Sequence, residues 1–390
     1  MGVRHFKKGV ISVKRKYSVI VIGAGSVGMA AGYNLGKRGV DTLLIDAHNP
    51  PHQKGSHHGK TRLIRHASGE GAKYVPLILR AQELWRQLEG TMDKKLFYPT
   101  GTLIVGEEQA PFIKDTVSVA RQCSLPLEKL TVNEMKLRWP AFSLPNYFTG
   151  YFEPTSGALL SQEIIRSYKQ LSVKHNVEFQ ANTTVSSIHL FANGAVVNAG
   201  DQTYYADKIV ISAGAWTKKI LNELDLPLQV VRKTFGWFET KKIDFQAPNS
   251  PCFYFSYENQ KYYGFPDIDG RGIKVGRNDS EVEMDPDAME QDFGKYKGDE
   301  GDLKCFINRF IPGATFKEGK VCMITKTPDK HFIIDTHPDF DHVFIAGGFS
   351  GHGFKYSSVI GEILSQLVVD GSTPHDISFF SMKRSFWNER

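Results

Sequence analysis

A glycine-rich turn near the N-terminus restricts the fold of this chain more than any other segment does. Residues 18–22 (SVIVI) are a short and largely β-branched apolar run, which is typical of a fully buried strand. The turn Gly23–Gly28 follows, and an Ala-, Met- and Leu-rich segment from about Val27 to Lys37 predicts a helix that Gly39 ends. A second strand is expected at Thr42–Ile45. Together these elements predict a βαβ unit of about 30 residues.

The glycine spacing and a following acid indicate a dinucleotide-binding site in this unit. Gly23 permits the tight turn, Gly25 lets the backbone approach a pyrophosphate, and Gly28 allows the helix to pack closely on the strand. The helix N-terminus supplies N–H donors to the phosphates. Asp46 is placed to accept hydrogen bonds from ribose hydroxyls, which favours an adenosine without a 2′-phosphate. The alternative is a glycine turn in a doubly wound sheet that holds no ligand.

Two later segments repeat the order of buried strand and small-residue turn. Residues 208–211 run into Ser212–Trp216, and residues 343–346 run into the glycine-rich loop Gly347–Gly353. A helix is expected from about Ser357 to Leu367, with its apolar residues on one face. These segments predict an α/β chain whose nucleotide-binding domain is assembled from separated stretches.

The intervening residues are richer in aromatic residues and in the alternation typical of half-buried strands. Residues 234–239 and 261–265 show this pattern, which predicts an antiparallel sheet in a second domain.

The formal net charge of +6 invites a nucleic-acid or membrane-surface interpretation. Residues 1–16 hold six basic groups and no acid, so residues 17–390 are electrically neutral. We therefore expect no nucleic-acid partner, and we interpret residues 1–16 as a disordered basic extension or an over-long start.

The cysteines and the apolar runs indicate the compartment. Four cysteines without a CxxC pair, in 390 residues, form neither a disulfide framework nor a zinc site. The basic N-terminus has no apolar core of a secretory signal, and no apolar run approaches the ~18 residues of a membrane span. The sequence therefore predicts a cytoplasmic protein with no membrane partner.

Five motifs together give the chain a specific resemblance. In order they are GSHHGKTRLIRH (55–66), KYYGFP (261–266), VCM (321–323), HFIID (331–335) and GFSGHGFK (348–355). With the N-terminal βαβ unit, they resemble the monomeric sarcosine oxidase and N-methyltryptophan oxidase family from about Tyr17 to Phe380.

The resemblance implies a two-domain FAD enzyme with a Rossmann-like cofactor domain and an antiparallel-sheet substrate domain. The expected cofactor domain comprises 17–80, 155–225 and 320–390, and the expected substrate domain comprises 81–154 and 226–319. Such enzymes oxidise a secondary amine, usually an N-methyl amino acid. The imine hydrolyses to an amino acid and formaldehyde, and O2 takes the electrons to give hydrogen peroxide.

The resemblance also implies that the flavin is bound covalently. Its 8α-methyl group is tethered to a cysteine in such enzymes, and Cys322 sits at the matching position. The tether retains the cofactor and raises its potential. Sequence spacing alone leaves open an inert, buried cysteine.

Several basic residues stand at positions that the resembled family uses to bind the substrate or to lie beside the flavin, and the resemblance implies the same roles here. Arg65 and Lys355 match the pair that binds the substrate carboxylate, and a forked arginine suits that task. Arg62 matches a residue close to the flavin ring, although surface charge is the alternative for both arginines. Lys274 matches the lysine that activates oxygen, since a fixed cation stabilises developing superoxide. Its alternation with apolar neighbours also fits an outward strand position. Tyr263 matches a substrate-side tyrosine.

The remaining cofactor positions follow from the same resemblance. Adjacent His57 and His58 rarely chelate one ion, so we assign no metal, and the role of His352 stays open. Besides the three glycines, Asp46, Arg62 and Cys322, the expected contacts to FAD are Ser56, His57, Thr61, Val185, Gly214 and Gly351.

Three substrate-side positions depart from the sarcosine oxidase pattern. Asn278 stands where the family usually has histidine, Ile324 where it has tyrosine, and Tyr254 aligns with a methionine. Asparagine does not titrate near neutrality, and the loss of a tyrosine hydroxyl changes the polarity around the substrate. We expect sarcosine to be a poor substrate and a related amine to fit better.

Two other functions stay open at this stage. The same fold could act on a cyclic imino acid or a fructosyl (Amadori) amino acid, or the chain could be a nucleotide-binding protein without activity. Joint retention of Cys322, Lys274, Arg65 and Lys355 argues against the second. By analogy with the family, we expect a monomer whose partners are a small amine and O2.

Overall fold

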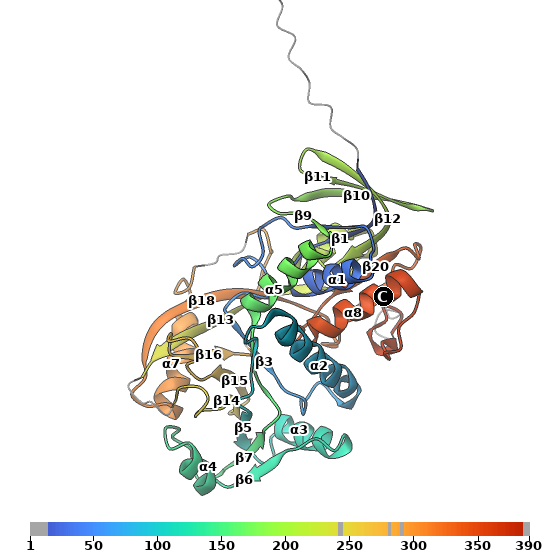
Figure 1. Cartoon of the computed structure of the whole chain (residues 1–390). Helices are drawn as coiled ribbons and strands as arrows, with labels where there is room; N and C mark the ends of the chain where they lie inside the picture. The colour runs from blue at the N-terminus through green and yellow to red at the C-terminus, as the bar shows by residue number, and fades with distance from the viewer. Residues whose placement is uncertain (1–14, 241–244, 280–281, 289–291, 385–390) are drawn as a thin grey trace, which may run out of the picture.

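Buried parallel strands form the centre of the first sheet in the computed structural model, which describes residues 15–240, 245–279, 282–288 and 292–384 (Figure 1). The strand order is β10-β11-β12-β1-β2-β9, with β20 also paired to β12 and β19 to β20. Strands β1, β2, β9, β12 and β20 run parallel to their neighbours in this central part. The bounds are β1 Arg15–Ile22, β2 Thr42–Ile45, β9 Glu178–Gln180, β10 Val185–Phe191, β11 Gly194–Ala199, β12 Gln202–Ile211, β19 Ile333–Thr336 and β20 Val343–Gly347.

The alternation along β1 divides the first sheet between two cores. Val19 and Val21 face a core that they share with residues of several helices. Ile20 and Ile22 face the opposite core, which also contains residues of β10, β11 and the segment after β12. Helix α1 packs against both α5 and α8 on the first of these faces. The helices of the chain are α1 Ser26–Lys37, α2 Val75–Met92, α3 Pro111–Gln122, α4 Val132–Arg138, α5 Ser161–Lys174, α6 Thr217–Ile220, α7 Lys297–Phe310 and α8 Ser357–Asp370.

The second sheet is largely antiparallel, as the alternating aromatic segments predict. Its order is β17-β13-β16-β15-β14-β5-β7-β6, and β18 also pairs with β13. Helix α7 covers an aromatic core that includes Phe253, Phe255, Phe306 and Phe310. The bounds are β5 Thr102–Glu107, β6 Glu128–Leu130, β7 Phe148–Glu153, β13 Gln229–Glu239, β14 Cys252–Tyr257, β15 Gln260–Phe265, β16 Ile273–Arg277, β17 Val282–Glu283 and β18 Thr315–Lys326.

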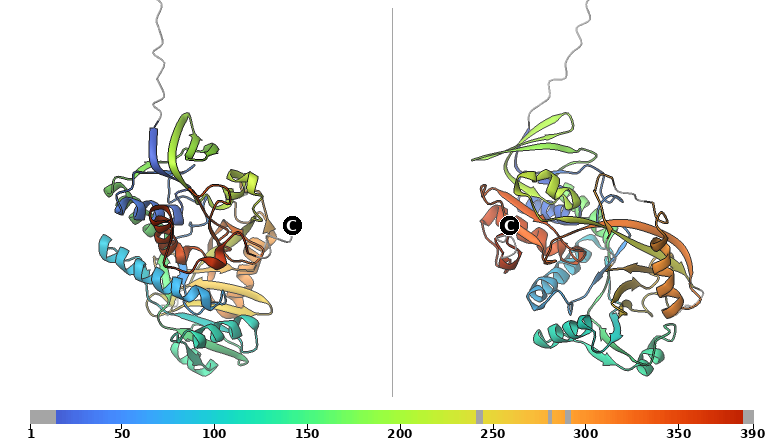
Figure 2. Two further views of the ribbon diagram at one scale, coloured as in Figure 1. Left: turned by 90° about the vertical axis from the view of Figure 1, so that its right-hand side faces the viewer. Right: turned by 180° about the vertical axis from the view of Figure 1, so that it is seen from behind.

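A third sheet of three short strands is separate from the two large sheets. It has the order β3-β8-β4, with bounds β3 Thr61–Ile64, β4 Phe97–Tyr98 and β8 Gly157–Leu160. Figures 1 and 2 show the first sheet with its hairpin at one end of the molecule and α4 with β6 at the other. The predicted fold class, an α/β unit assembled from separated segments with a second and largely antiparallel sheet, is confirmed by this arrangement.

Three sequence expectations differ in detail from the structure. Strand β1 begins at Arg15, inside the expected extension, because the long partner strand β12 offers pairing out to Tyr204, and Lys16 reaches Asp207 at 2.8 Å. Residues 1–14 lie outside the described residues. The expected domain boundaries at 80 and 320 fall inside α2 and β18. In the second sheet, β14 and β5 pair in parallel, which local alternation does not reveal.

Among the described residues, no helix is both long and apolar enough to cross a membrane.

Candidate active site

A cavity of about 660 Å³ lies where strands of the first sheet end. Gly214 follows β12, the loop from Gly348 to Lys355 follows β20, and Ser26 opens α1 after β1; all contribute to its wall. Ligands of open α/β sheets bind in this position, outside the carboxyl ends of the strands. The other wall comes from the second sheet and from β3, so the cavity joins both parts of the fold.

The glycine turn is packed as closely as its spacing predicts. Gly23 has φ +89°, and a Cβ there would come 2.6 Å from the Ser212 carbonyl oxygen. A Cβ on Gly28 would come 1.9 Å from the Gly23 oxygen. Near Gly25 a Cβ would meet only His57 Nδ1, at 3.6 Å, so this backbone borders open space. No side chain caps the following helix, and its first N–H groups are therefore available to an anion.

Asp46 at the end of β2 organises the same turn. Its carboxylate accepts hydrogen bonds from the backbone N–H of Ala24 and of His48, both at 2.8 Å. A carboxylate has further acceptor capacity, so it can also receive ribose hydroxyls. The turn, the uncapped helix and the acid fit the adenosine and pyrophosphate of FAD. Val185 begins β10 and packs at the edge of the first sheet's core. The residues that line the cavity do not include Val185, Thr61, Asp46 or the three glycines of the turn.

The loop before β3 is held by Arg62. The guanidinium donates to the carbonyl oxygens of Ser56 and His58 at 2.6 Å and of Thr61 at 2.7 Å. Ser56 Oγ donates to the Met323 carbonyl oxygen at 2.6 Å, which ties the loop to β18. Ser56, Arg62 and His57 all line the cavity, so the predicted loop reaches the predicted site.

Lys274 on β16 lies buried behind that loop rather than in the cavity wall. Its ammonium donates to the Gly59 oxygen at 2.7 Å and to the backbone and side-chain oxygens of Thr61 at 3.1 and 3.3 Å. It also lies 4.5 Å from the ring centre of Phe235, which does line the cavity. Burial, and then the Arg62 charge, lower the pKa of Lys274 well below its usual range. The outward strand position considered from the sequence is therefore wrong.

Cys322 on β18 lines the cavity and packs with Phe235 and Trp237. Burial raises the pKa of its thiol, and among nearby cations Arg62 opposes this most, followed by Lys274. The sulfur is thus held in an apolar place that faces both a cation and the cavity.

Arg65 and Lys355 both line the cavity, and a third charged residue, Glu70, lies with them. Glu70 accepts an ion pair from Lys355 at 3.1 Å. Burial opposes ionisation of Glu70, but Lys355 and then His352 hold its pKa well below the usual range. Burial lowers the pKa of Lys355, and Glu70 opposes that shift. The cluster keeps one excess positive charge when all three groups are ionised.

The substrate-side residues of the second sheet line the same cavity. Asn278 Nδ2 donates to the Tyr254 hydroxyl at 2.9 Å, and burial raises the pKa of Tyr254 to about 12. Burial also raises the pKa of Tyr263. Ile324 lies against the loop after β20, where a Cβ on Gly351 would come 3.0 Å from its Cδ1.

Sequence patterns missed Glu70, Phe112 and Lys233, which also line the cavity. Glu70 lies in an irregular loop and Phe112 in the first turn of α3, where nothing local indicates a site. Lys233 pairs in register with Cys322 across β13 and β18, a relation that only the folded sheet creates. His352, whose role was left open, donates from Nε2 to the Lys330 carbonyl oxygen at 3.2 Å, and burial lowers its pKa to about 4.

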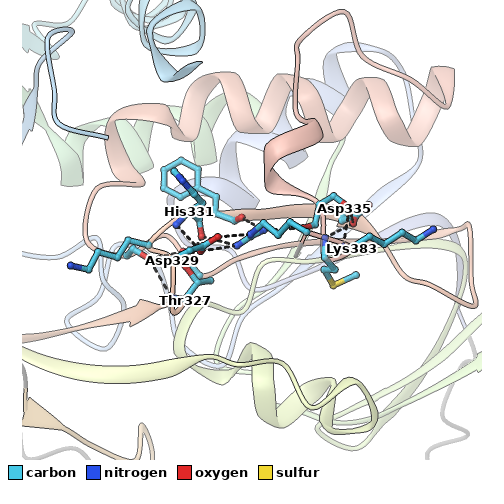
Figure 3. A network of polar contacts seen from close by, with 12 residues as sticks. Thr327, Asp329, His331, Asp335 and Lys383 are labelled. Carbon is cyan, nitrogen blue, oxygen red and sulfur yellow. Dashed lines mark hydrogen bonds and ion pairs between the residues drawn. The ribbon is translucent and has the colours of Figure 1, made fainter. Parts of the chain in front are cut away.

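A network of polar contacts joins the C-terminal segment to the loop after β18 (Figure 3). Asp329 and His331 belong to the loop that follows β18 and line the cavity. Arg384 donates to Asp329 at 2.7 and 3.1 Å and to the His331 carbonyl oxygen at 3.2 Å. Asp335 accepts from Ser381 and Met382 nearby. The last described residues therefore hold this loop in place.

The side chains of His57 and His58 lie in different surroundings and are not arranged to bind one metal ion together. His57 lies beside Gly25, whereas the His58 ring packs on Phe235. Within the ranges that the structure describes, no three His, Cys, Asp or Glu side chains are arranged to hold a metal ion.

A glycine turn suited to a dinucleotide, next to a cavity lined by buried cations and tyrosines, is the arrangement of a dinucleotide-dependent enzyme. The family model described as FAD dependent oxidoreductase matches residues 18–367, and the chain belongs to this family. It is 45% identical over 380 residues to monomeric sarcosine oxidase of Arthrobacter sp. (strain TE1826), covering 96% of this chain and 98% of that one. It is 38% identical over 370 residues to N-methyl-L-tryptophan oxidase of Yersinia pestis (strain Pestoides F), covering 94% and 99%. The resemblance stated from the motifs is confirmed.

A solved structure shows the same fold. The open form of NikD, an unusual amino acid oxidase essential for nikkomycin biosynthesis, superposes with a TM-score of 0.85 at 22% identity, covering 94% of this chain and 98% of that one. At 22% sequence identity, this similarity shows a shared fold and carries no conclusion about the substrate.

Proposed function

We propose that this flavoprotein oxidises the secondary amine of an N-methyl amino acid. With O2 and water the reaction yields the primary amino acid, formaldehyde and hydrogen peroxide. The observation that carries the proposal is the joint presence of Arg65, Lys355 and Cys322 in one cavity, whose wall also includes Ser26 at the start of the helix that follows the glycine turn. The names of the two relatives, a sarcosine oxidase and an N-methyl-L-tryptophan oxidase, support the same chemistry.

The residues of the chain bind and prepare the amine. Arg65 and Lys355 receive the substrate carboxylate, which places the amine deeper in the cavity, near Tyr263 and Cys322. The positive charge of Arg62, which lines the cavity, disfavours a second cation beside it, so it favours the neutral amine that can be oxidised. Bound FAD supplies the two-electron acceptor. Nothing in this scheme needs a carboxylate base.

The substrate proposal predicts a measurable preference. Because Tyr254 and Ile324 replace residues of the sarcosine oxidase pattern, we expect faster peroxide formation with bulkier N-methyl amino acids than with sarcosine. A peroxide-coupled assay would compare kcat/KM for sarcosine, N-methylalanine, N-methyltryptophan, proline and a fructosyl amino acid. Equal or better turnover of sarcosine would contradict the preference. If the enzyme oxidised only proline or only the fructosyl amino acid, the substrate would instead be a cyclic imino acid or an Amadori compound.

We further propose that FAD is attached through Cys322, since the thiol lines the cavity and faces nearby cations. After acid precipitation of the purified protein, the yellow colour should stay in the pellet. In Cys322→Ser it should move to the supernatant, whereas Cys252→Ser, at a buried cysteine outside the cavity, should behave as the wild type. Colour in the supernatant of the wild type would refute the attachment.

The proposal includes a monomer that acts in the cytoplasm. The name of the Arthrobacter relative supports the monomer, and four cysteines without a disulfide support a reducing compartment.

A further inference from the structure

Arg65 is a buried charge with few partners of its own. It is 4% exposed, and in the described part of the chain its one hydrogen bond is a long contact of 3.4 Å from Nη1 to the Ala67 oxygen. Among the same residues, no carboxylate comes within ion-pair distance, because Glu70 pairs with Lys355 instead. A buried guanidinium with unused donors has to be supported by something other than hydrogen bonds.

Two aromatic rings supply that support. Phe112, in the first turn of α3, stacks on Tyr254 of β14 with ring centres 4.4 Å apart and an angle of 20°. We call these two rings the aromatic shelf. The guanidinium carbon of Arg65 lies 4.7 Å from the ring centre of Tyr254 and 5.2 Å from that of Phe112. At these distances the negative ring faces attract the cation while leaving its N–H groups free to bind an anion.

The shelf is itself held by Asn278. The side-chain amide donates to the Tyr254 hydroxyl at 2.9 Å. The backbone of Asn278 is fixed on both sides, since its N–H donates to the Lys261 oxygen at 2.7 Å and its carbonyl accepts from Lys233 Nζ at 2.8 Å. An asparagine does not titrate, so this hydrogen bond persists over the pH range in which a histidine would change charge.

We propose that Phe112, Tyr254 and Asn278 are positioning residues that hold the Arg65 guanidinium ready for the carboxylate of an amino-acid substrate. The inference rests on the proposed function, because it assumes that the substrate carries a carboxylate. It assigns a specific task to two of the positions that depart from the sarcosine oxidase pattern, and it adds Phe112, which no sequence pattern indicated.

The first test measures carboxylate binding without turnover. Propanoate has no oxidisable C–N bond, and its binding to the purified holoenzyme can be followed by the change in flavin absorbance. Phe112→Leu keeps an apolar side chain but loses the ring, and we expect about tenfold weaker propanoate binding. Phe112→Tyr should restore binding to within about twofold of wild type. Phe191→Leu, at a 55% exposed phenylalanine on β10, is the matched control and should bind propanoate normally.

A second test separates positioning from general damage to the cavity. In Phe112→Leu the KM for an N-methyl amino acid should rise about tenfold with kcat within about twofold, whereas the KM for its carboxamide should stay unchanged. Tyr254→Phe and Asn278→Ala remove the same hydrogen bond, so the double variant should bind propanoate no more weakly than the weaker single one.

The outcomes distinguish this inference from the substrate proposal. Unchanged propanoate binding in Phe112→Leu, an equal rise in the carboxamide KM, or a wild type that does not bind propanoate would each overturn it. Weaker propanoate binding in the variant would support it even if the wild type oxidised none of the N-methyl amino acids, in which case the substrate proposal alone would fail.

Discussion

Replacing Arg65 by methionine should lower kcat/KM for an N-methyl amino acid by on the order of 10²- to 10³-fold. Charge-assisted hydrogen bonds to a carboxylate contribute about 1.5–3 kcal/mol each, and a forked guanidinium makes two. Most of the loss should appear in KM, because the carboxylate is bound equally before and during the reaction. Fold stability should be little affected, since Arg65 makes only one long hydrogen bond among the described residues and methionine can pack against the same two rings.

A charge-conserving variant controls this experiment. Arg65→Lys keeps the cation but loses the planar fork, so its kcat/KM should fall between those of the wild type and Arg65→Met. Steady-state kinetics with the N-methyl amino acid and its carboxamide would show both effects. If Arg65→Met had the wild-type KM, carboxylate binding by this residue would be refuted.

Replacing Lys274 by methionine should slow oxygen consumption by on the order of 10²- to 10³-fold, the usual cost of removing a preorganised charge from a reacting centre. Anaerobic bleaching of the flavin absorbance by the amine should change far less, because Lys274 does not line the cavity in which the carboxylate and amine bind. Lys320→Met, at a partly exposed lysine of β18 that pairs with Glu318, is a matched control and should keep the wild-type oxygen rate.

The pH dependence of that rate has a definite sign. Burial holds the pKa of Lys274 well below its usual range, so the positive charge is present at low pH and is lost as the pH rises through the lowered pKa. The oxygen reaction of the wild type should therefore slow toward alkaline pH, and this fall should be absent in Lys274→Met. Parallel profiles in stopped-flow experiments would argue against a role for the lysine charge.

Local patterns predicted the elements that depend on local physics. In the βαβ unit, the end of β1, the helix α1 and the strand β2 were placed almost to the residue, because a β-branched run, a glycine turn and a helical period each act over a few neighbours. The parallel pairing of β5 with β14 joins residues 102–107 to residues 252–257, and no pattern within either segment indicates it. The start of β1 at Arg15 likewise depends on the length of its distant partner β12.

The candidate site divides in the same way. The glycine turn and Asp46 could be derived from the sequence itself, whereas Arg65, Lys355 and Cys322 came from the family resemblance. The pairing of Glu70 with Lys355 and the stacking of Phe112 on Tyr254 are tertiary contacts, which spacing in the chain does not contain. The six basic charges of residues 1–16 set the net charge, while Arg65, Lys274 and Lys355 are buried in the neutral remainder of the chain.

The most direct test of the flavin amine oxidase assignment mixes the purified protein with an N-methyl amino acid in the absence of air and then admits oxygen. The account predicts that the flavin absorbance bleaches without oxygen and returns with it, releasing one formaldehyde and one hydrogen peroxide for each amine consumed. A flavin absorbance that stays unchanged with every secondary amine tested would contradict it.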